Sequence, residues 1–453
     1  MSNFSRRDFV SILGASTAGL SITPLSSFYA RPAHARMIHG CGFGPLESKL
    51  PVNTDSLPDP YKSEAFLSLP EQFSYSVASI TGEIMSDGHP VPGSHDGMGA
   101  FRGCGGNIVV VRNHELNTGE GVMVSDGSYY DATRAGGTTT LEFDQRGRLQ
   151  AHYGSLAGTE RNCAGGPTPW DTWLTCEETF STGDERHGYV FEVPSDGLAD
   201  PTPIRAMGRF NHEAAAVDPR TGYIYLTEDR GDSVFYRYRP HDSCDLRAGG
   251  VLEALRLLDF PEGINTKNGF LDHLYEPFAV DWVIVDEVDP DSESDGNSTR
   301  SQAQAKGAAV FSRGEGAWYG NQRIYFCCTN GGEAGKGQVW AYHPRRCELT
   351  LFVEAQKDPE NPDLEDNGGF LVAAPDNICV APDGRLYLCE DGSGVEKVVG
   401  VDRDGSLFEF ARNVYNNSEF AGVCFCPRGR LMFVNLQNPG LTLVIHGPWR
   451  RRA

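Results

Sequence analysis

The segment Arg385-Leu-Tyr-Leu-Cys-Glu-Asp391, which follows the turn signal Pro382-Asp-Gly384, is the clearest copy of the pattern that decides the fold. A short run of β-favouring apolar residues ends on acidic residues, and the Pro-Asp-Gly before it is typical of a tight turn. Strands of the same kind, each ending at Glu, Asp or Asn, are predicted at 107–113, 172–178, 223–229, 323–330 and 430–435. Such recurrence indicates one repeat-built β protein.

A second element precedes each of these strands. It is a polar residue that opens a run of small or apolar residues, and it lies at a nearly constant distance before the next strand's polar end. Asp96 precedes Asn113 by 17 positions, and Asp376 precedes Glu390 by 14. The openers are Asp96, Cys163, Glu213, Glu315, Asp376 and Glu419. Six strand–turn–strand copies predict an all-β fold, a six-bladed β-propeller with a central metal-lined channel.

Composition narrows the class of protein. The chain has 453 residues, of which 39% are hydrophobic and 53 are glycine, so a large core and many tight turns are expected. The formal net charge of −22 argues against binding to nucleic acid or to anionic lipid. No run of 18 apolar residues occurs, so we expect no stable membrane span. We also expect a monomer.

The N-terminus is predicted to be a targeting segment. Ser5-Arg-Arg-Asp-Phe-Val10 is typical of a twin-arginine (Tat) motif, a mildly apolar stretch follows, and Ala33-His-Ala35 fits a cleavage site. We therefore expect a signal peptide at 1–35, the Tat translocase as an export partner, and a bacterial periplasmic or secreted protein. An N-terminal arm at 36–68 and the propeller at 69–453 follow.

An acidic, Ser-rich insertion near 286–305 interrupts the repeats. An EF-hand is excluded, because the twelfth position counted from Asp291 is Gln302 rather than Glu. A solvated loop or a lid is predicted instead.

The repeat brings acidic residues together. In a propeller the innermost strands line the channel, so the openers should form a ring and the strand ends a second tier. Facing carboxylates repel and raise each other's pKa unless cations are bound. Carboxylates suit Ca²⁺, whereas a thiolate suits iron or zinc. The predicted metal ligands are Cys163, Glu178, Glu213, Glu315, Asp376, Asp96, Glu177, Glu228 and Glu390.

Simpler interpretations stay open for these residues. Carboxylates at loop ends are commonly solvated, and Cys163 could be a packing residue like Cys176 or Cys327. Arg313, two positions before Glu315, could clamp an anionic substrate or form a salt bridge with the ring itself.

Several segments resemble the PhoX family of exported alkaline phosphatases. They are Asn162-Cys-Ala-Gly-Gly-Pro-Thr-Pro-Trp-Asp-Thr-Trp-Leu-Thr-Cys-Glu-Glu178, Leu69–Tyr75, Asp96–Met98, Asn211–Ala214 and Ser418–Gly422. The resemblance implies a six-bladed propeller, Tat export, an Fe³⁺ and Ca²⁺ cofactor and phosphomonoester hydrolysis at alkaline pH.

The resemblance also implies roles for single residues. Cys163 would be the iron-binding thiolate, Glu213, Glu315 and Asp376 carboxylate ligands, and Arg313 the phosphate-contacting arginine. Glu178 would join the metal shell. One departure is that Gly154–Arg161 contains no lysine, where the family's phosphatases carry one that contacts substrate.

The expected function is an exported, metal-dependent phosphomonoesterase. It would hydrolyse small phosphate esters with a metal-activated oxygen nucleophile, and Arg313 would be catalytic by stabilising transition-state charge. No cofactor beyond metals is expected, since no GxSxG, P-loop or GxGxxG motif lies on a strand–turn–helix unit. The alternatives are a catalytically silent calcium- and iron-binding propeller and a calcium-dependent lactonase-type hydrolase. The lactonase would have no use for an iron-binding Cys163.

Overall fold

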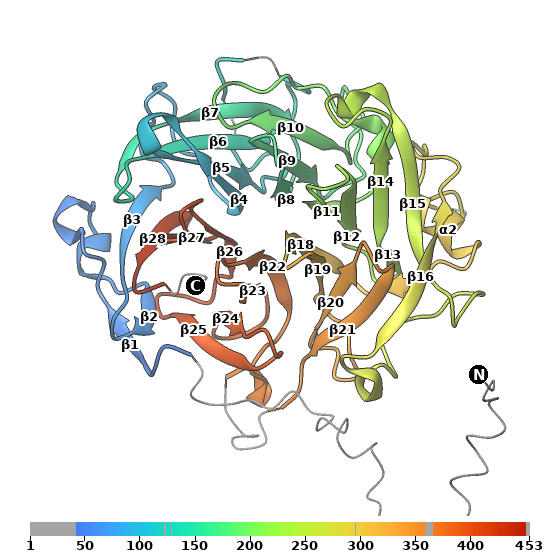
Figure 1. The fold of residues 1–453 in the computed structure, drawn as a ribbon. Helices are drawn as coiled ribbons and strands as arrows, with labels where there is room; N and C mark the ends of the chain where they lie inside the picture. The colour runs from blue at the N-terminus through green and yellow to red at the C-terminus, as the bar shows by residue number, and fades with distance from the viewer. Residues whose placement is uncertain (1–41, 122–123, 128, 295, 358–365, 450–453) are drawn as a thin grey trace, which may run out of the picture. The chain divides into compact units, whose positions relative to one another are not determined.

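The apolar runs that recur in the sequence form the strands of an all-β, propeller-like arrangement (Figure 1). The computed structural model describes residues 42–449 apart from 122–123, 128, 295 and 358–365, all within the unit Ala35–Ala453. The predicted signal peptide and the first residues of the predicted arm lie outside the described residues. The all-β prediction is confirmed.

The innermost strands surround the centre of Figure 1, and each lies beside the next until β26 returns beside β4. They are β4 (His95–Arg102), β8 (Asn162–Pro167), β11 (His212–Val217), β18 (Gly314–Gly320), β22 (Pro375–Val380) and β26 (Phe420–Phe425). Each pairs with an antiparallel second strand that matches a predicted strand to within two residues. These are β5 (Ile108–His114), β9 (Thr172–Glu177), β12 (Ile224–Glu228), β19 (Arg323–Cys328), β23 (Leu386–Glu390) and β27 (Leu431–Leu436).

Further antiparallel strands extend each sheet outward. They are β6 (Gly136–Phe143), β7 (Leu149–Thr159), β10 (Val190–Pro194), β14 (Tyr236–Pro240), β15 (Gly250–Leu257), β20 (Gln338–His343), β21 (Glu348–Glu354), β24 (Lys397–Val401), β25 (Leu407–Asn413) and β28 (Leu441–His446). The strand orders are β4-β5-β6-β7, β8-β9-β10, β11-β12-β14-β15, β18-β19-β20-β21 and β22-β23-β24-β25. β16 (Pro277–Ile284) pairs with both β15 and β21 and joins their sheets.

The N-terminal part of the described chain closes the arrangement. β3 (Ser74–Ile80) pairs with β28 and completes the sheet β26-β27-β28-β3, so blue and red strands lie side by side in Figure 1. β1 (Leu46–Lys49), from the predicted arm, and β2 (Leu67–Pro70), which crosses the predicted boundary at 68, add to the outer edge of β25. Both ends of the chain therefore contribute strands to sheets, which resists opening of the ring.

The remaining elements are short. β13 (Ser233–Val234) pairs with β17 (Val310–Phe311), and α2 (Thr299–Gln304) is capped by the Ser298 side chain. The 3-10 helices are Thr54–Ser56, Tyr61–Ser63, Cys104–Gly106, Arg205–Met207, Leu246–Ala248, Leu271–His273 and Asp366–Gly369. Among the described residues, no helix is long and apolar enough to cross a membrane.

The innermost strands carry a shared irregularity. The pairing register of each with its second strand shifts near its start, between His95 and Met98 in β4 and between Pro375 and Ile378 in β22, and likewise in the other four. Such β-bulges bend a strand and turn a side chain to a new direction. Each sequence repeat of an opener followed by a strand therefore corresponds to one β-bulge near the start of an innermost strand.

Close packing around the centre explains the small residues after each opener. A Cβ atom at Gly97 would lie 2.6 Å from the carbonyl oxygen of Cys163, and one at Gly316 would lie 2.5 Å from that of Asp376. Below the bulges, Trp318 packs among several hydrophobic clusters and lines a central cavity of only about 20 Å³. Among the described residues, side chains therefore leave little free space around Trp318.

The segment near 286–305 is bound to the rest of the protein in its described part. Asp289 accepts a hydrogen bond from the Tyr189 hydroxyl (2.7 Å), and Glu293 forms an ion pair with Arg230 (3.0 Å). These carboxylates hold the segment against the sheets instead of leaving it free in water.

Candidate metal centre and active site

The bulges direct five of the predicted ligands toward one another. Asp96, Cys163, Glu213, Glu315 and Asp376 are each the first residue inside the bulge of their strand. All are buried except Asp376, which is half-buried. One bulge per strand therefore places one polar side chain per strand at the end of the central axis.

Two overlapping groups could each hold a cation. Ligand atoms of Cys163, Glu178 and Glu213 lie within 4.8 Å of one another, and so do those of Glu213, Glu315 and Asp376. Glu213 belongs to both groups. The first offers sulfur and oxygen, and the second offers oxygen alone.

A second tier of acids follows the second strands. Glu115, Glu178, Asp229 and Asp391 each come directly after the last residue of β5, β9, β12 or β23. Gln437, after β27, donates hydrogen bonds to Glu115 (2.7 Å) and to Asp96 (3.4 Å), which ties the two tiers together. Glu115 was absent from the predicted set. It could have been found from the sequence, because it directly follows the strand ending at Asn113-His114, as the other second-tier acids follow their strands.

Glu177, Glu228 and Glu390 do not join this cluster, contrary to the predicted placement. Each is the last residue of its strand, one position before a second-tier acid, and successive side chains of a strand point to opposite faces. Glu177 accepts hydrogen bonds from His187 Nδ1 (2.7 Å) and from the backbone N–H of Gly188 (2.9 Å).

The other two carboxylates are also bound elsewhere. Glu228 accepts from the Tyr236 hydroxyl (2.9 Å) and from Arg300 (2.8 Å), and Glu390 accepts from the backbone N–H of Ala373 (2.7 Å). All three carboxylates of this set are fully buried and support the sheets rather than facing the axis.

The strand β26 departs from the pattern of the other innermost strands. Its bulge lies between Ala421 and Cys424, so Gly422 stands where the others carry a ligand-type side chain. A Cβ there would lie 2.3 Å from the carbonyl oxygen of Asp96, and Gly422 has a φ of +64°. The predicted opener Glu419 lies just before the strand, and it is close enough to the cluster for Asp391 and Asp376 to raise its pKa beyond the increase that burial causes.

Burial and mutual repulsion dominate the electrostatics of the cluster. Burial raises the pKa of Asp376 to about 8, with further increases from Asp391 and Glu115. Burial likewise raises the pKa of Glu178 to about 7, although Arg161 opposes the shift. Burial and then Glu213 hold the pKa of the Cys163 thiol well above its usual range. Without added cations these groups therefore keep their protons to a higher pH than usual.

The donor set fits bound cations. The Cys163 thiol donates a hydrogen bond to Glu213 Oε2 at 2.7 Å. A cation bound by both the Cys163 sulfur and the Glu213 carboxylate could replace the shared proton. Asp96 Oδ1 is buried and has no hydrogen-bond partner among the described residues. Carboxylate oxygens suit hard cations, and a thiolate beside them suits a transition ion.

Two arginines border the acidic cluster. Arg313 grips Asp229 with two hydrogen bonds (2.7 and 2.8 Å) and donates a third to Glu315 (2.9 Å). Arg161 forms ion pairs with Glu115 (2.5 Å) and with Glu178. Both have positive φ, +53° and +50°, which costs free energy for a residue other than glycine. The salt bridge between Arg313 and the acidic cluster, one of the two roles considered for this residue, is thus present. Arg313 donates its hydrogen bonds to Asp229 and Glu315 through Nε and Nη2.

The family model for alkaline phosphatase PhoX matches residues 52–153 and 146–440. The chain belongs to the PhoX family of alkaline phosphatases. Membership makes it a phosphatase, and the matched range contains every residue of the cluster described above. A comparison with curated protein sequences finds no match.

A solved structure supports the propeller-like fold. PhoX of Pseudomonas fluorescens in complex with vanadate, a transition-state analogue, matches with a TM-score of 0.68 and 17% identity. The match covers 90% of this chain and 97% of that one. A gluconolactonase of Xanthomonas campestris matches with a TM-score of 0.39 and 14% identity over 79% of this chain and 97% of that one. A Bacteroides thetaiotaomicron protein of unknown function matches with 0.45 and 10%, over 83% and 76%.

Proposed function

We propose that this chain is an exported, metal-dependent phosphomonoesterase built on a six-bladed β-propeller. The observation that carries the proposal is the partly buried acidic cluster, in which nine carboxylates and one thiol face two arginines. The carboxylates are Asp96, Glu115, Glu178, Glu213, Asp229, Glu315, Asp376, Asp391 and Glu419. Six blades are supported by the closed succession of bulged innermost strands.

We propose Fe³⁺ and Ca²⁺ as the cations. Cys163, Glu178 and Glu213 would hold iron, because this group alone offers sulfur, and Glu213, Glu315 and Asp376 would hold calcium. When bound, the cations would supply Lewis-acid neutralisation of the phosphoryl oxygens and activation of the attacking oxygen.

Arg313 is proposed to bind the substrate. Asp229 and Glu315 fix its guanidinium plane through Nε and Nη2, and this leaves Nη1 to donate to a phosphate oxygen. A guanidinium held in place before substrate arrives loses little entropy on binding and stabilises charge that develops in the transition state.

Arg161 is proposed to take the positioning role of the lysine that this chain lacks. Its side chain turns toward the cluster, where it bridges Glu115 and Glu178 and also donates to Asn117 Oδ1 (3.3 Å). It would thereby orient two carboxylates and add positive charge at the mouth. The missing lysine also supports a second candidate, a metal-binding propeller without turnover.

The cellular context follows from the sequence rather than from the described residues. We propose a Tat signal peptide at 1–35, passage through the Tat translocase, and a monomeric enzyme in the periplasm or outside the cell. Small phosphate esters are the proposed substrates. The acidic insertion near 286–305 lies beside the site, because its Glu293 accepts a hydrogen bond from Asn211 (2.9 Å) and pairs with Arg230 (3.0 Å), the neighbour of Asp229.

The test uses the exported, metal-loaded protein. We expect turnover of p-nitrophenyl phosphate between pH 7 and 10, loss of turnover with a chelator, and iron and calcium by elemental analysis. Arg313→Gln should lower kcat/KM by about 100-fold, as expected for loss of a preorganised charged donor. The exposed Arg345→Gln is the matched control.

Three results would contradict parts of this proposal. Metal-loaded protein without turnover would favour the silent propeller. Calcium without iron would favour a lactonase-type hydrolase or a binding protein. A full iron content in Cys163→Ala would remove that thiol from the metal shell.

A further inference from the structure

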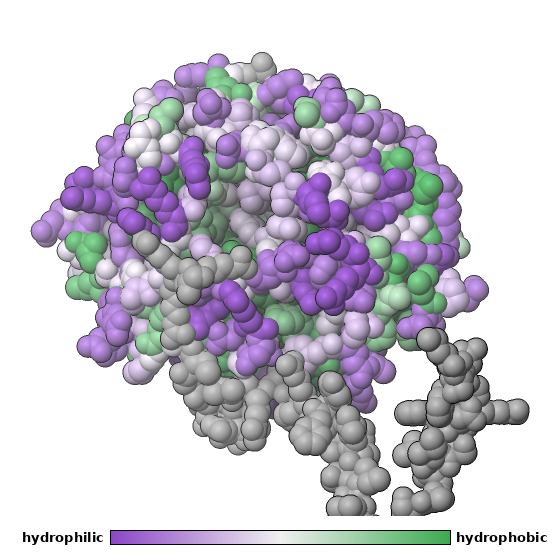
Figure 2. All heavy atoms as spheres, in the orientation of Figure 1, coloured by the Kyte–Doolittle hydropathy of each residue, from purple (hydrophilic) through white to green (hydrophobic). Residues whose placement is uncertain are grey.

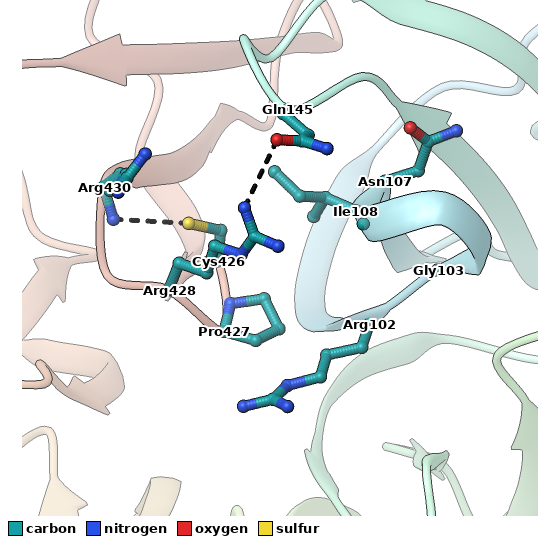
Figure 3. A pocket seen from close by; sticks show the side chains of 10 residues that line it. Arg102, Gly103, Asn107, Ile108, Gln145, Cys426, Pro427, Arg428 and Arg430 are labelled. Atoms are coloured by element: carbon teal, nitrogen blue, oxygen red, sulfur yellow. Dashed lines mark hydrogen bonds between the residues drawn. The ribbon is translucent and has the colours of Figure 1, made fainter.

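A pocket lies at the opposite ends of the strands from the acidic cluster. It has a volume of about 190 Å³ and lies between the turn joining β4 to β5 and the turn joining β26 to β27, with Gln145 from the next turn above it (Figure 3). Asp96 is near the start of β4 and Arg102 is its last residue. Six residues of extended strand separate the two sites by about 20 Å.

The charge of this pocket is opposite to that of the cluster. Arg102, Arg428 and Arg430 line it, and its lining contains no acidic residue. None of the three has an ion-pair partner among the described residues, whereas Arg161 and Arg313 each pair with two carboxylates. In a chain of net charge −22, three unpaired guanidinium groups around one pocket make a local positive field.

Glycine shapes one wall of the pocket. Gly106 has a φ of +86°, and a Cβ on it would lie 2.8 Å from Gln145 Nε2 and 3.1 Å from Arg428 Nη2. The missing side chain lets these two donor groups converge on the backbone of the turn. Gln145 in turn is fixed, because it donates to the Gly105 carbonyl (3.2 Å) and accepts from Arg428 Nη1 (3.3 Å).

The floor of the pocket differs from its rim. Ile108 and Cys426 are buried beneath it, whereas all three arginines are exposed. In Figure 3, Arg102 extends from the end of β4 and Arg428 from the turn before β27, and a dashed line joins Arg428 to Gln145. An apolar floor under charged donors strengthens their attraction for an anion, because less water competes.

We propose that this pocket is a second anion site, which binds a phosphate group between Arg102, Arg428 and Arg430. Guanidinium forks match pairs of phosphate oxygens, and Gln145 adds an oriented amide donor. The small volume suits free phosphate or the phosphate end of a small ester rather than a large ligand. The site stands on its own chemistry and does not depend on the proposed catalytic function.

Calorimetric titration of the metal-loaded protein with inorganic phosphate tests the proposal. We expect two classes of site, one weakened by Arg313→Gln and the other by Arg428→Gln or Arg102→Gln. Each lost charged hydrogen-bond donor should weaken binding by about tenfold or more. All three pocket arginines are exposed, so these variants should fold, and an unchanged melting temperature verifies it.

Arg345→Gln, an exposed arginine in another turn, is the matched control. A single class of site that disappears in Arg313→Gln would overturn the proposal. Equal weakening by Arg345→Gln and Arg428→Gln would also overturn it, since that result reports only net charge. Titration of Arg313→Gln with phenyl phosphate then distinguishes the two sources, because binding there identifies an ester, and binding of inorganic phosphate alone identifies the free ion.

Discussion

Replacing Asn113 with aspartate tests whether the second strands hold the bulges in place. Asn113 is fully buried in β5, and its amide donates to the carbonyl oxygens of Cys163 (2.9 Å) and Ala164 (2.7 Å). Its oxygen accepts from Trp173 (2.9 Å) and Thr175 (2.9 Å), and an aspartate side chain keeps that half of the arrangement.

The expected cost follows from the two N–H donors that the aspartate side chain lacks. Each backbone carbonyl left unpaired in the interior costs about 1–3 kcal/mol, so Asn113→Asp should lower the free energy of unfolding by about 2–6 kcal/mol. A protonated carboxyl could restore one of the bonds, which would give the lower half of that range. This is a large part of an ordinary protein's stability.

The assay is urea unfolding of the metal-loaded protein, with iron content as a second measurement. Asn297→Asp, at an exposed position in the acidic insertion, gives the same charge change without buried bonds. We expect a lower urea midpoint and less iron in Asn113→Asp alone, since Cys163 sits in the bulge that Asn113 holds. Equal midpoints for the two variants would refute the bracing role of Asn113.

Three further predictions concern charge. Chelated protein should lose stability as pH rises from about 4.5 to 8. The raised pKa values of Glu178 (about 7) and Asp376 (about 8) favour the protonated folded state at low pH, and that advantage is lost as the two groups ionise. Urea midpoints measured across this pH range test the prediction, and a flat profile would contradict it. Glu178→Gln should lower metal content with little loss of stability, whereas Glu177→Gln should lower the urea midpoint with little loss of metal. Burial lowers the pKa of His187, but Glu177 and then Asp131 raise it overall. Wild type should therefore be more stable than His187→Gln at low pH, and this difference should shrink as pH rises above about 6.5. A difference that stays constant with pH would count against the ion pair.

The fold was predictable because its units are local. Strand β23 was visible as Leu386–Glu390 between a Pro-Asp-Gly turn and an acidic end, and its neighbours repeat that pattern. Alternation and turn chemistry act within a few residues, so one chain is enough to detect them. The pairing of β3 with β28 could not be seen in this way, because it joins residues more than 350 positions apart.

The candidate site was predictable to the level of the strand but not always of the side chain. The openers were found because a bulge keeps one polar residue in the same place of each repeat. At the strand ends, adjacent carboxylates such as Glu177 and Glu178 point to opposite faces. Which of the two faces the axis depends on where the pairing of the strand with its neighbour ends, here at Glu177. Neither residue type nor spacing reports that position, so Glu177 was included. Glu115 was missed for another reason, because the strand was predicted to end at Asn113, two positions before it.

The net charge alone would have misled about anionic ligands. With every group ionised, nine carboxylates and two arginines would give the cluster a formal charge of −7, about a third of the formal −22 for the whole chain. Figure 2 shows hydrophilic side chains over much of the face viewed in Figure 1, with smaller hydrophobic patches among them.

Local charge decides which anions bind. At physiological ionic strength charges are screened over about 8 Å, and the arginine pocket lies about 20 Å from the cluster along β4. The two ends of the strands therefore act independently. Cations at one end and unpaired guanidinium groups at the other can each attract a phosphate group while the surface between them repels a polyanion. Raising the salt concentration should accordingly weaken phosphate binding to the exposed Arg102, Arg428 and Arg430 more than binding at the partly buried cluster.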